Sequence, residues 1–325
     1  MYVWEKTNAV KGGNRKFNRM GVHHVYQRAQ DRGIIFYSVI DRLVYHSILS
    51  VKSREYKIRV LAVAIMYSHV HQSCMAETKE RLYKYIQDSS SIFARMHNLH
   101  YGRHGSLFSR PFGSSLKRTA KEIRSNLAYV NNNHTEKGLC QSALQAKWNL
   151  LTYREKRNPR KFESDISPNL IKAYLLIDRM VLTNKYLTYR KINDMLKDLN
   201  DAEKESLTDY ILSRYPLVDY ETAEGFFGGF DKMLAAFDSN TGSEYGIREE
   251  YSAAPDTAYT EMISCAEKHS LLGTTKPLLL RLTEEKRQQM VPGFLQKTSA
   301  RKFQACKFLH LPDPESPYCG GIYPQ

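Results

Sequence analysis

Residues 57–66, KIRVLAVAIM, form a short run of mostly apolar side chains rich in β-branched residues. Only Tyr67 and Ser68 separate this run from a second extended segment, HVHQSCM at 69–75. A run of this length and composition predicts a buried strand, and the two-residue connection predicts a hairpin with the segment that follows. The fold is therefore expected to contain a sheet that includes this hairpin.

The segments around the hairpin alternate between strand and helix patterns. The order is strand, helix, hairpin, helix, strand, helix, with further strands expected at 21–28 and 106–117 and helices at 41–56, 77–101 and 119–133. Thr119, with Glu122 three residues later, predicts a capping box at the start of the last helix. The pattern predicts an α+β fold with a small antiparallel, ferredoxin-like sheet and helices packed on one face.

The surplus of basic over acidic residues belongs wholly to the first half of the chain. The whole chain carries a net charge of +14, whereas residues 1–160 alone hold 28 Lys and Arg against 10 Asp and Glu, which gives +18. A basic surplus of this size, mixed with Tyr, Phe and His, suits a surface that binds phosphates and so predicts a nucleic-acid partner. A basic but merely solvated face is the alternative.

Several classes of protein are disfavoured by composition. The first 21 residues contain basic side chains but no apolar core of a signal peptide, and no apolar run approaches the 18 residues that a membrane span requires. The five cysteines have no zinc-type spacing and no regular disulfide framework. We therefore expect a protein without membrane association, located in the reducing cytoplasm with the nucleoid.

A polar, proline-containing stretch divides the chain at the point where the charge changes. The predicted organisation is a basic arm at 1–20, a sheet domain at 21–155, a linker at 156–167 and a mainly helical accessory domain at 168–325. Within the last part, residues 218–260 are acidic and rich in small residues, which favours loops, and 282–311 resemble a basic helical pair. Reading of duplex DNA by that pair is a secondary alternative to packing or protein contact.

The hairpin also carries a pair of histidines with a geometric meaning. His69 and His71 lie two residues apart on a strand and share one face, while Val70 points to the core. Two imidazoles on one face can bind a divalent cation, although such a pair also occurs by chance. On the last helix, Tyr129 and Asn133 lie one turn apart, so an amide oxygen and a phenol could join the same site.

Four ordered stretches of residues 20–140 resemble one family, the HUH single-tyrosine transposases and in particular the REP-associated tyrosine transposases. The resemblance rests on a His- and Arg-containing strand followed by an Asp-Arg pair, on the His-hydrophobic-His motif, on a glycine-aromatic strand and on a tyrosine helix. These motifs are HHVYQRAQDRGIIF (23–36) with Asp41–Arg42, AVAIMYSHVH (62–71), GRHGSLFSRPFGSS (102–115) and YVNNNHTEKGL (129–139).

The resemblance implies a mechanism and a set of roles. His69, His71 and Asn133 would bind Mg²⁺ or Mn²⁺, and Tyr129 would attack a phosphate of single-stranded DNA, often beside a hairpin or palindromic repeat. Cleavage would give a 5′-phosphotyrosine intermediate that a 3′-hydroxyl later resolves, and such enzymes can act as homodimers. The sequence departs from the family at three positions, which are Ser68, Gln72 and His134.

Basic side chains near these motifs are predicted to contact DNA. They are Arg28 on the first strand, Lys117, Arg118, Lys121 and Arg124 around the tyrosine helix, and Arg15, Lys16 and Arg19 in the N-terminal arm. Two other functions stay open. One is a catalytically weak or inactive protein that binds single-stranded nucleic acid on the same sheet, and the other is a nuclease in which water attacks in place of Tyr129.

Overall fold

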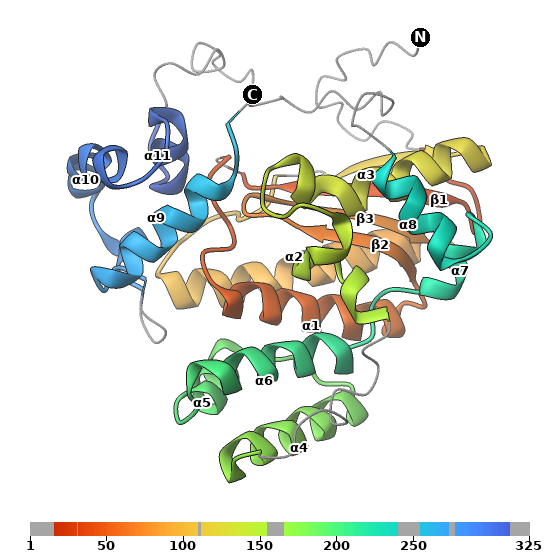
Figure 1. Ribbon diagram of the computed structural model, residues 1–325, viewed down its shortest axis with the longest axis horizontal. Helices are drawn as coiled ribbons and strands as arrows, with labels where there is room; N and C mark the ends of the chain where they lie inside the picture. The colour runs from red at the N-terminus through yellow and green to blue at the C-terminus, as the bar shows by residue number, and fades with distance from the viewer. Residues whose placement is uncertain are drawn as a thin grey trace.

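The computed structural model describes residues 16–30, 32–109, 112–154, 166–239, 254–272 and 277–312. Arg15, most of the predicted linker and part of the acidic stretch at 218–260 lie outside these ranges. Figure 1 shows a sheet with helices on both faces, further helices below it and a group of three helices at one side.

The first half forms an antiparallel sheet of four strands in the order β2-β3-β1-β4. The first six elements follow the chain in the predicted order and confirm an α+β fold with this sheet. The last strand is shorter than predicted, because Phe108 forms only an isolated bridge with Ala29. The bounds are β1 Val22–Arg28, α1 Val39–Glu55, β2 Arg59–Ile65, β3 His69–Met75, α2 Lys79–Tyr101, β4 Gly113–Lys117 and α3 Ala120–Glu136.

The alternation of side chains along β3 assigns them to two separate cores. Val70 and Cys74 are fully buried in the cluster formed with α1 and α2. The opposite face of the sheet packs against α3 through a second cluster that includes Ala64 of β2 and Leu127 and Val130 of α3. The prediction of helices on one face therefore holds for α1 and α2 but omits α3, which covers the other face (Figure 1).

The start of α3 differs slightly from the predicted capping box. The Thr119 hydroxyl accepts a hydrogen bond from the Glu122 amide at 3.1 Å, as predicted. The Glu122 carboxylate instead accepts from the amide of Arg118, one residue before the cap, at 2.7 Å. The helix start is still satisfied by side chains, with the carboxylate near the positive end of the helix dipole.

The carboxylate of Asp41 joins three helices. This fully buried residue accepts hydrogen bonds from the Ser38 amide at 2.8 Å, the Tyr101 hydroxyl at 2.8 Å and the Tyr189 hydroxyl at 2.5 Å. Burial raises the pKa of Asp41, and the hydrogen bonds to the carboxylate oppose that shift. Asp41 thereby links the start of α1 to the end of α2 and to a helix of the second half.

The second half packs on the first in three groups. Helices α5 and α6 lie against α1 and extend its apolar cluster, with α4 packed on the outer side of α5 and α6, α8 packs against α3, and α9 to α11 form a third cluster around Ile34, Tyr37 and Tyr101. None of the described helices has the length and apolar character needed to cross a membrane. The bounds are α4 Pro168–Leu182, α5 Tyr189–Leu196, α6 Asp201–Arg214, α7 Tyr220–Gly225, α8 Phe230–Asp238, α9 Thr257–Lys268, α10 Glu284–Lys297 and α11 Lys302–Phe308, with 3₁₀ turns at Ala143–Gln145, Lys147–Asn149, Leu151–Arg154 and Leu279–Arg281.

Replacing Asp41 with alanine is expected to lower the free energy of unfolding by about 3 kcal/mol, because two buried tyrosine hydroxyls lose their acceptor together with the helix cap. Urea denaturation measures this difference. Asp41→Asn is the matched control, since it keeps one acceptor oxygen and should cost much less. Equal losses for the two variants would contradict a role for the hydrogen bonds.

Stability is expected to fall at acid pH because of His46. Burial lowers the pKa of this fully buried ring to about 4, whereas in the unfolded chain the ring has its ordinary pKa of 6.5. The unfolded state therefore binds more protons between these values, so the unfolding free energy decreases as pH falls through this window.

Between about pH 7.5 and about pH 5, His46 should contribute a loss of about 2 kcal/mol. Urea denaturation of His46→Leu at both pH values should show a pH dependence smaller by this amount than in the wild type. The comparison isolates His46 from the other buried histidines, and an unchanged pH dependence would show that the ring titrates normally.

Candidate active site

The histidine pair of β3 lies on the face of the sheet that α3 covers. His69 and His71 are cross-strand from Arg28 and Tyr26 of β1, and their ring centroids are 5.0 Å apart with planes at 84°. His71 is buried, whereas His69 is only partly so. The structure therefore places both imidazoles on one face, as the strand alternation requires.

Tyr129 of α3 lies directly against this pair. Its ring centroid is 5.4 Å from that of His71 and 5.7 Å from that of His24, both in edge-to-face geometry. The apolar residues Leu127 and Val130 on either side pack α3 onto the sheet and fix the position of Tyr129. Tyr129 is 5% exposed, so the phenol is enclosed by the protein on most sides.

Hydrogen bonds at Nδ1 hold both histidine rings. His24 Nε2 lies 2.9 Å from His71 Nδ1, and the Ser68 hydroxyl lies 3.1 Å from His69 Nδ1. In the tautomer in which Nδ1–H donates to these partners, Nε2 is left with a lone pair that a metal could take, and such outer contacts orient metal-binding histidines. Ser68, a departure from the family pattern, thus has a contact that suits the same arrangement.

Asn133 lies one turn after Tyr129 and is 2% exposed. Its side-chain nitrogen donates to the Tyr129 carbonyl at 2.9 Å, so the amide oxygen is the end that could bind a cation. Asn126, two turns before Asn133 on α3, accepts a hydrogen bond at its side-chain oxygen from the Ser73 hydroxyl of β3 at 2.7 Å. This buried bond ties the tyrosine helix to the histidine strand.

The side of the site toward β1 and β4 is more open. Tyr26 is half-buried beside His71, and the Arg28 guanidinium carbon lies 5.5 Å from the centre of the Tyr26 ring. Gly113 of β4 makes room for Tyr26, because a Cβ there would lie 2.0 Å from the ring. His24 and Tyr26 of β1 both contact His71, because their alternation with Arg28 places all three side chains on one face of the strand.

The other two departures from the family pattern have different surroundings. Gln72 points to the opposite face of β3, where its side-chain oxygen accepts from the Tyr85 hydroxyl at 2.6 Å. His134 is 4% exposed, and burial, followed by the positive charge of Arg42, lowers its pKa to about 3. Neither residue adds charge to the cluster of His69, His71 and Tyr129 near neutral pH.

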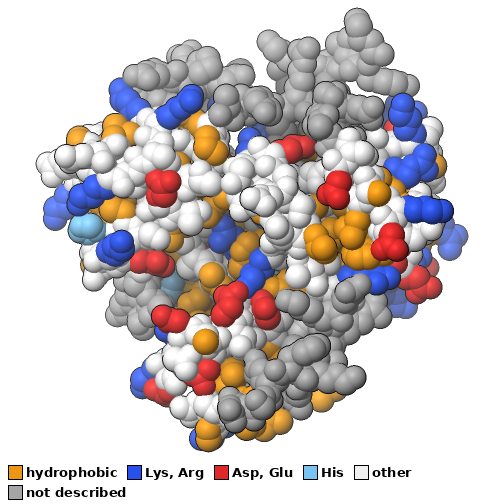
Figure 2. Space-filling view, in the orientation of Figure 1, with side chains coloured by type: hydrophobic (Ala, Val, Ile, Leu, Met, Phe, Trp, Pro, Cys, Tyr) orange, Lys and Arg blue, Asp and Glu red, His pale blue; other side chains and the backbone are white. Residues whose placement is uncertain are grey.

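The predicted DNA contacts fall mainly at one end of the sheet. Arg118, Lys121 and Arg124 are exposed at the start of α3, and Lys117 at the end of β4 is partly buried, which lowers its pKa. Lys16 and Arg19 are exposed just before β1, at the same end, since Val22 pairs with Lys117. Figure 2 shows Lys and Arg along the right-hand edge of the face, the side on which Figure 1 places α3, α7 and α8.

The chemistry of the donors suits a divalent cation only as a mixed site. Among the described residues, no group of three or more His, Cys, Asp and Glu side chains is arranged to hold a metal. The two imidazoles of β3 and the Asn133 amide oxygen are a neutral nitrogen and oxygen set, which Mn²⁺ and Mg²⁺ accept when phosphate and water supply the remaining ligands.

Comparison with known proteins gives little. No protein-family model matches the sequence, and no curated protein matches it either. A solved structure of a REP-associated tyrosine transposase bound to a REP hairpin is similar at a TM-score of 0.39 and 14% identity, over 49% of this chain and 94% of that chain. A likeness of this strength assigns no function, which must be inferred from the geometry of the site.

The hydrogen bond between Gln72 and Tyr85, on the face of β3 opposite the histidines, can be tested by mutation. Gln72→Leu should lower the unfolding free energy by about 1–2 kcal/mol, because the buried Tyr85 hydroxyl loses its acceptor. Adding Tyr85→Phe should recover most of this loss, since both polar partners are then replaced. Urea denaturation of the two single variants and the double variant measures the coupling, and purely additive losses would argue against the bond.

Proposed function

We propose that the protein is a metal-dependent strand transferase that cleaves and rejoins single-stranded DNA through Tyr129. The observation that carries this proposal is the packing of the Tyr129 ring against His71, next to a second histidine on the same strand face. The strand order β2-β3-β1-β4 supports it, because this is the ferredoxin-like order that the resemblance to HUH transposases implies.

In the proposed mechanism, His69 and His71 bind the cation through Nε2 and Asn133 binds it through its amide oxygen. The bound Mg²⁺ or Mn²⁺ would polarise the scissile phosphate and reduce its repulsion of a phenolate. His24 and Ser68 act as positioning residues, because their hydrogen bonds fix the orientation of the two rings.

Tyr129 supplies the nucleophile. Its phenol oxygen forms a bond to the phosphorus and the bond to the 3′-oxygen of the preceding nucleotide breaks, which leaves a 5′-phosphotyrosine and a 3′-hydroxyl. The phenol proton is released, and the departing 3′-oxygen takes up a proton. A 3′-hydroxyl reverses these steps when it attacks the phosphotyrosine, so the phosphodiester energy is conserved and no nucleotide cofactor is needed.

The DNA strand would approach from the open side of the site. Tyr26 offers a partly exposed ring and Arg28 an exposed cation next to His71, a combination that suits a base and its phosphate. Arg118, Lys121 and Arg124 are exposed at the start of α3, five to eleven residues before Tyr129 in sequence. These cations would bind the neighbouring phosphates of the strand. In this arrangement Tyr26 would stack on a base, while Arg28 and the cations near α3 would bind phosphates.

A second candidate function follows from the burial of Tyr129. A phenol that is 5% exposed must be uncovered before it can reach a phosphate. If that does not happen, the same surface would bind single-stranded nucleic acid without chemistry. Such a protein would bind without a metal and would tolerate the loss of Tyr129.

The proposed chemistry is tested by trapping the covalent intermediate. Purified protein incubated with hairpin-flanked single-stranded DNA and Mn²⁺ should give a protein–DNA band on a denaturing gel. Tyr129→Phe should abolish the band, and His69→Ala, His71→Ala or EDTA should reduce it by at least about 100-fold, because the developing charge loses its cation.

Tyr26→Phe is the matched control, since it alters a tyrosine of the same site and keeps the ring, and it should retain the adduct. DNA cleavage that survives in Tyr129→Phe would indicate attack by water and a nuclease. Tight binding without an adduct under either metal would favour the non-catalytic binder.

A further inference from the structure

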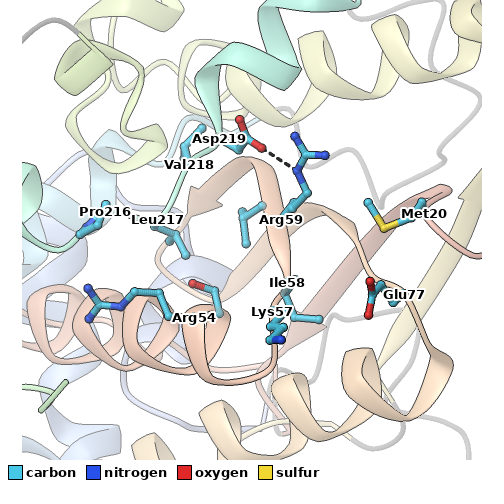
Figure 3. A pocket seen from close by; sticks show the side chains of 12 residues that line it. Met20, Arg54, Lys57, Ile58, Arg59, Glu77, Pro216, Leu217, Val218 and Asp219 are labelled. Atoms are coloured by element: carbon cyan, nitrogen blue, oxygen red, sulfur yellow. Dashed lines mark hydrogen bonds and ion pairs between the residues drawn. The ribbon is translucent and has the colours of Figure 1, made fainter.

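A second pocket lies at the end of the sheet where β2 begins. It has a volume of about 440 Å³, which falls in the range of small-molecule sites. Its floor is apolar, and Figure 3 shows Arg54 and Lys57 on the α1 side, opposite the ion pair of Arg59 and Asp219. The apolar lining consists of Met20, Ile58, Val60, Pro216, Leu217 and Val218.

The charges around the pocket leave it positive. Both carboxylates are paired, since Asp219 lies 2.8 Å from the Arg59 guanidinium and Glu77 forms an ion pair with Arg81. Arg54 and Lys57 have no carboxylate partner within the described part of the chain, and both are exposed. Two cations without a carboxylate partner therefore lie at the rim, beside a floor that a sugar or base could contact.

Lys57 occupies a backbone position that favours glycine. Its φ is 53°, and the amides of Lys57 and Ile58 bond back to the carbonyls of Arg54 and Ser53, which is a Schellman motif at the end of α1. A lysine in this left-handed conformation costs about 1 kcal/mol relative to glycine. Glycine at this position would fit the backbone without strain, so the lysine charge can be removed there without disturbing the fold.

The pocket continues the basic surface that begins at α3. Arg59 at the start of β2 pairs with Met75, which pairs with Val22, which in turn pairs with Lys117 at the end of β4. The pocket and the start of α3 are therefore at the same end of the sheet, about 14 Å apart across three strand spacings. Lys16 and Arg19 shortly precede Met20, which lines the pocket, and lie at the same end of the sheet.

We propose that this pocket is a second DNA subsite, which binds two neighbouring phosphodiesters of one strand, one through Arg54 and one through Lys57, and the sugar or base between them on the apolar floor. The identity of the ligand as DNA rests on the proposed function, whereas the preference for a phosphate with an attached sugar rests on the pocket itself. The subsite holds the flank of the bound strand, away from the scissile phosphate.

The test measures how affinity depends on strand length. Fluorescently labelled oligothymidylates of about 4 and about 25 nucleotides are chosen because the first is too short to span both sites. In the wild type the long strand should bind much more tightly. The ratio of the two dissociation constants should fall about 5-fold in Lys57→Gly and about 25-fold in Arg54→Gln/Lys57→Gly at 0.1 M salt, since each lost phosphate contact removes a slope of about 0.7 in log affinity against log salt.

Lys57→Gly is suited to this test because glycine fits the backbone, so thermal stability should be unchanged or higher. Lys172→Ala, which removes an exposed charge from α4, is the control and should leave the ratio as in the wild type. A ratio unchanged in both pocket variants would overturn the proposal, whether or not Tyr129 forms an adduct. Thymidine monophosphate that binds the pocket while the ratio stays unchanged would also overturn it, in favour of a free nucleotide.

Discussion

The structure depends on a central strand that is covered on both faces. Along β3, Val70 and Cys74 enter the core beneath the sheet while His69, His71 and Ser73 face α3. Because side chains alternate with a period of two, a shift of one residue in pairing would exchange these two sets. The buried aliphatic core therefore fixes the register that brings the imidazoles to Tyr129.

The candidate site combines enclosed reactive groups with an open, positively charged approach. The rings of His24, His71 and Tyr129 are mutually packed and nearly inaccessible, whereas Tyr26 and His69 have partial exposure. Most of the exposed cations near the sheet lie at its far end and at the start of α3, whereas Arg28 lies cross-strand from His69 at the site itself. The positive charge that we propose for DNA binding therefore reaches from the far end of the sheet to the edge of the proposed metal site.

Much of the first half could be predicted from the sequence because local patterns and tertiary packing agree there. The hairpin at 57–75 has apolar side chains of the right period, and Thr119 predicted the start of α3 correctly. The contact of Tyr129 with His71 could be inferred only through family resemblance, since residues 58 apart carry no local signal of proximity. The strand at 106–117 was predicted too long, because Phe108 forms only an isolated bridge with Ala29 and, among the described residues, only Gly113–Lys117 pairs with β1 as a strand.

The buried carboxylate of Asp41 makes the folding of the first half depend on the second half. Its partners come from residue 38, from Tyr101 and from Tyr189, which lies beyond the charge boundary near residue 160. The apolar face of α1 is likewise covered by α5 and α6. The helical half thus serves as part of the interior of the sheet half, so a premature stop after the sheet would remove the folded protein as a whole rather than release an independent catalytic module.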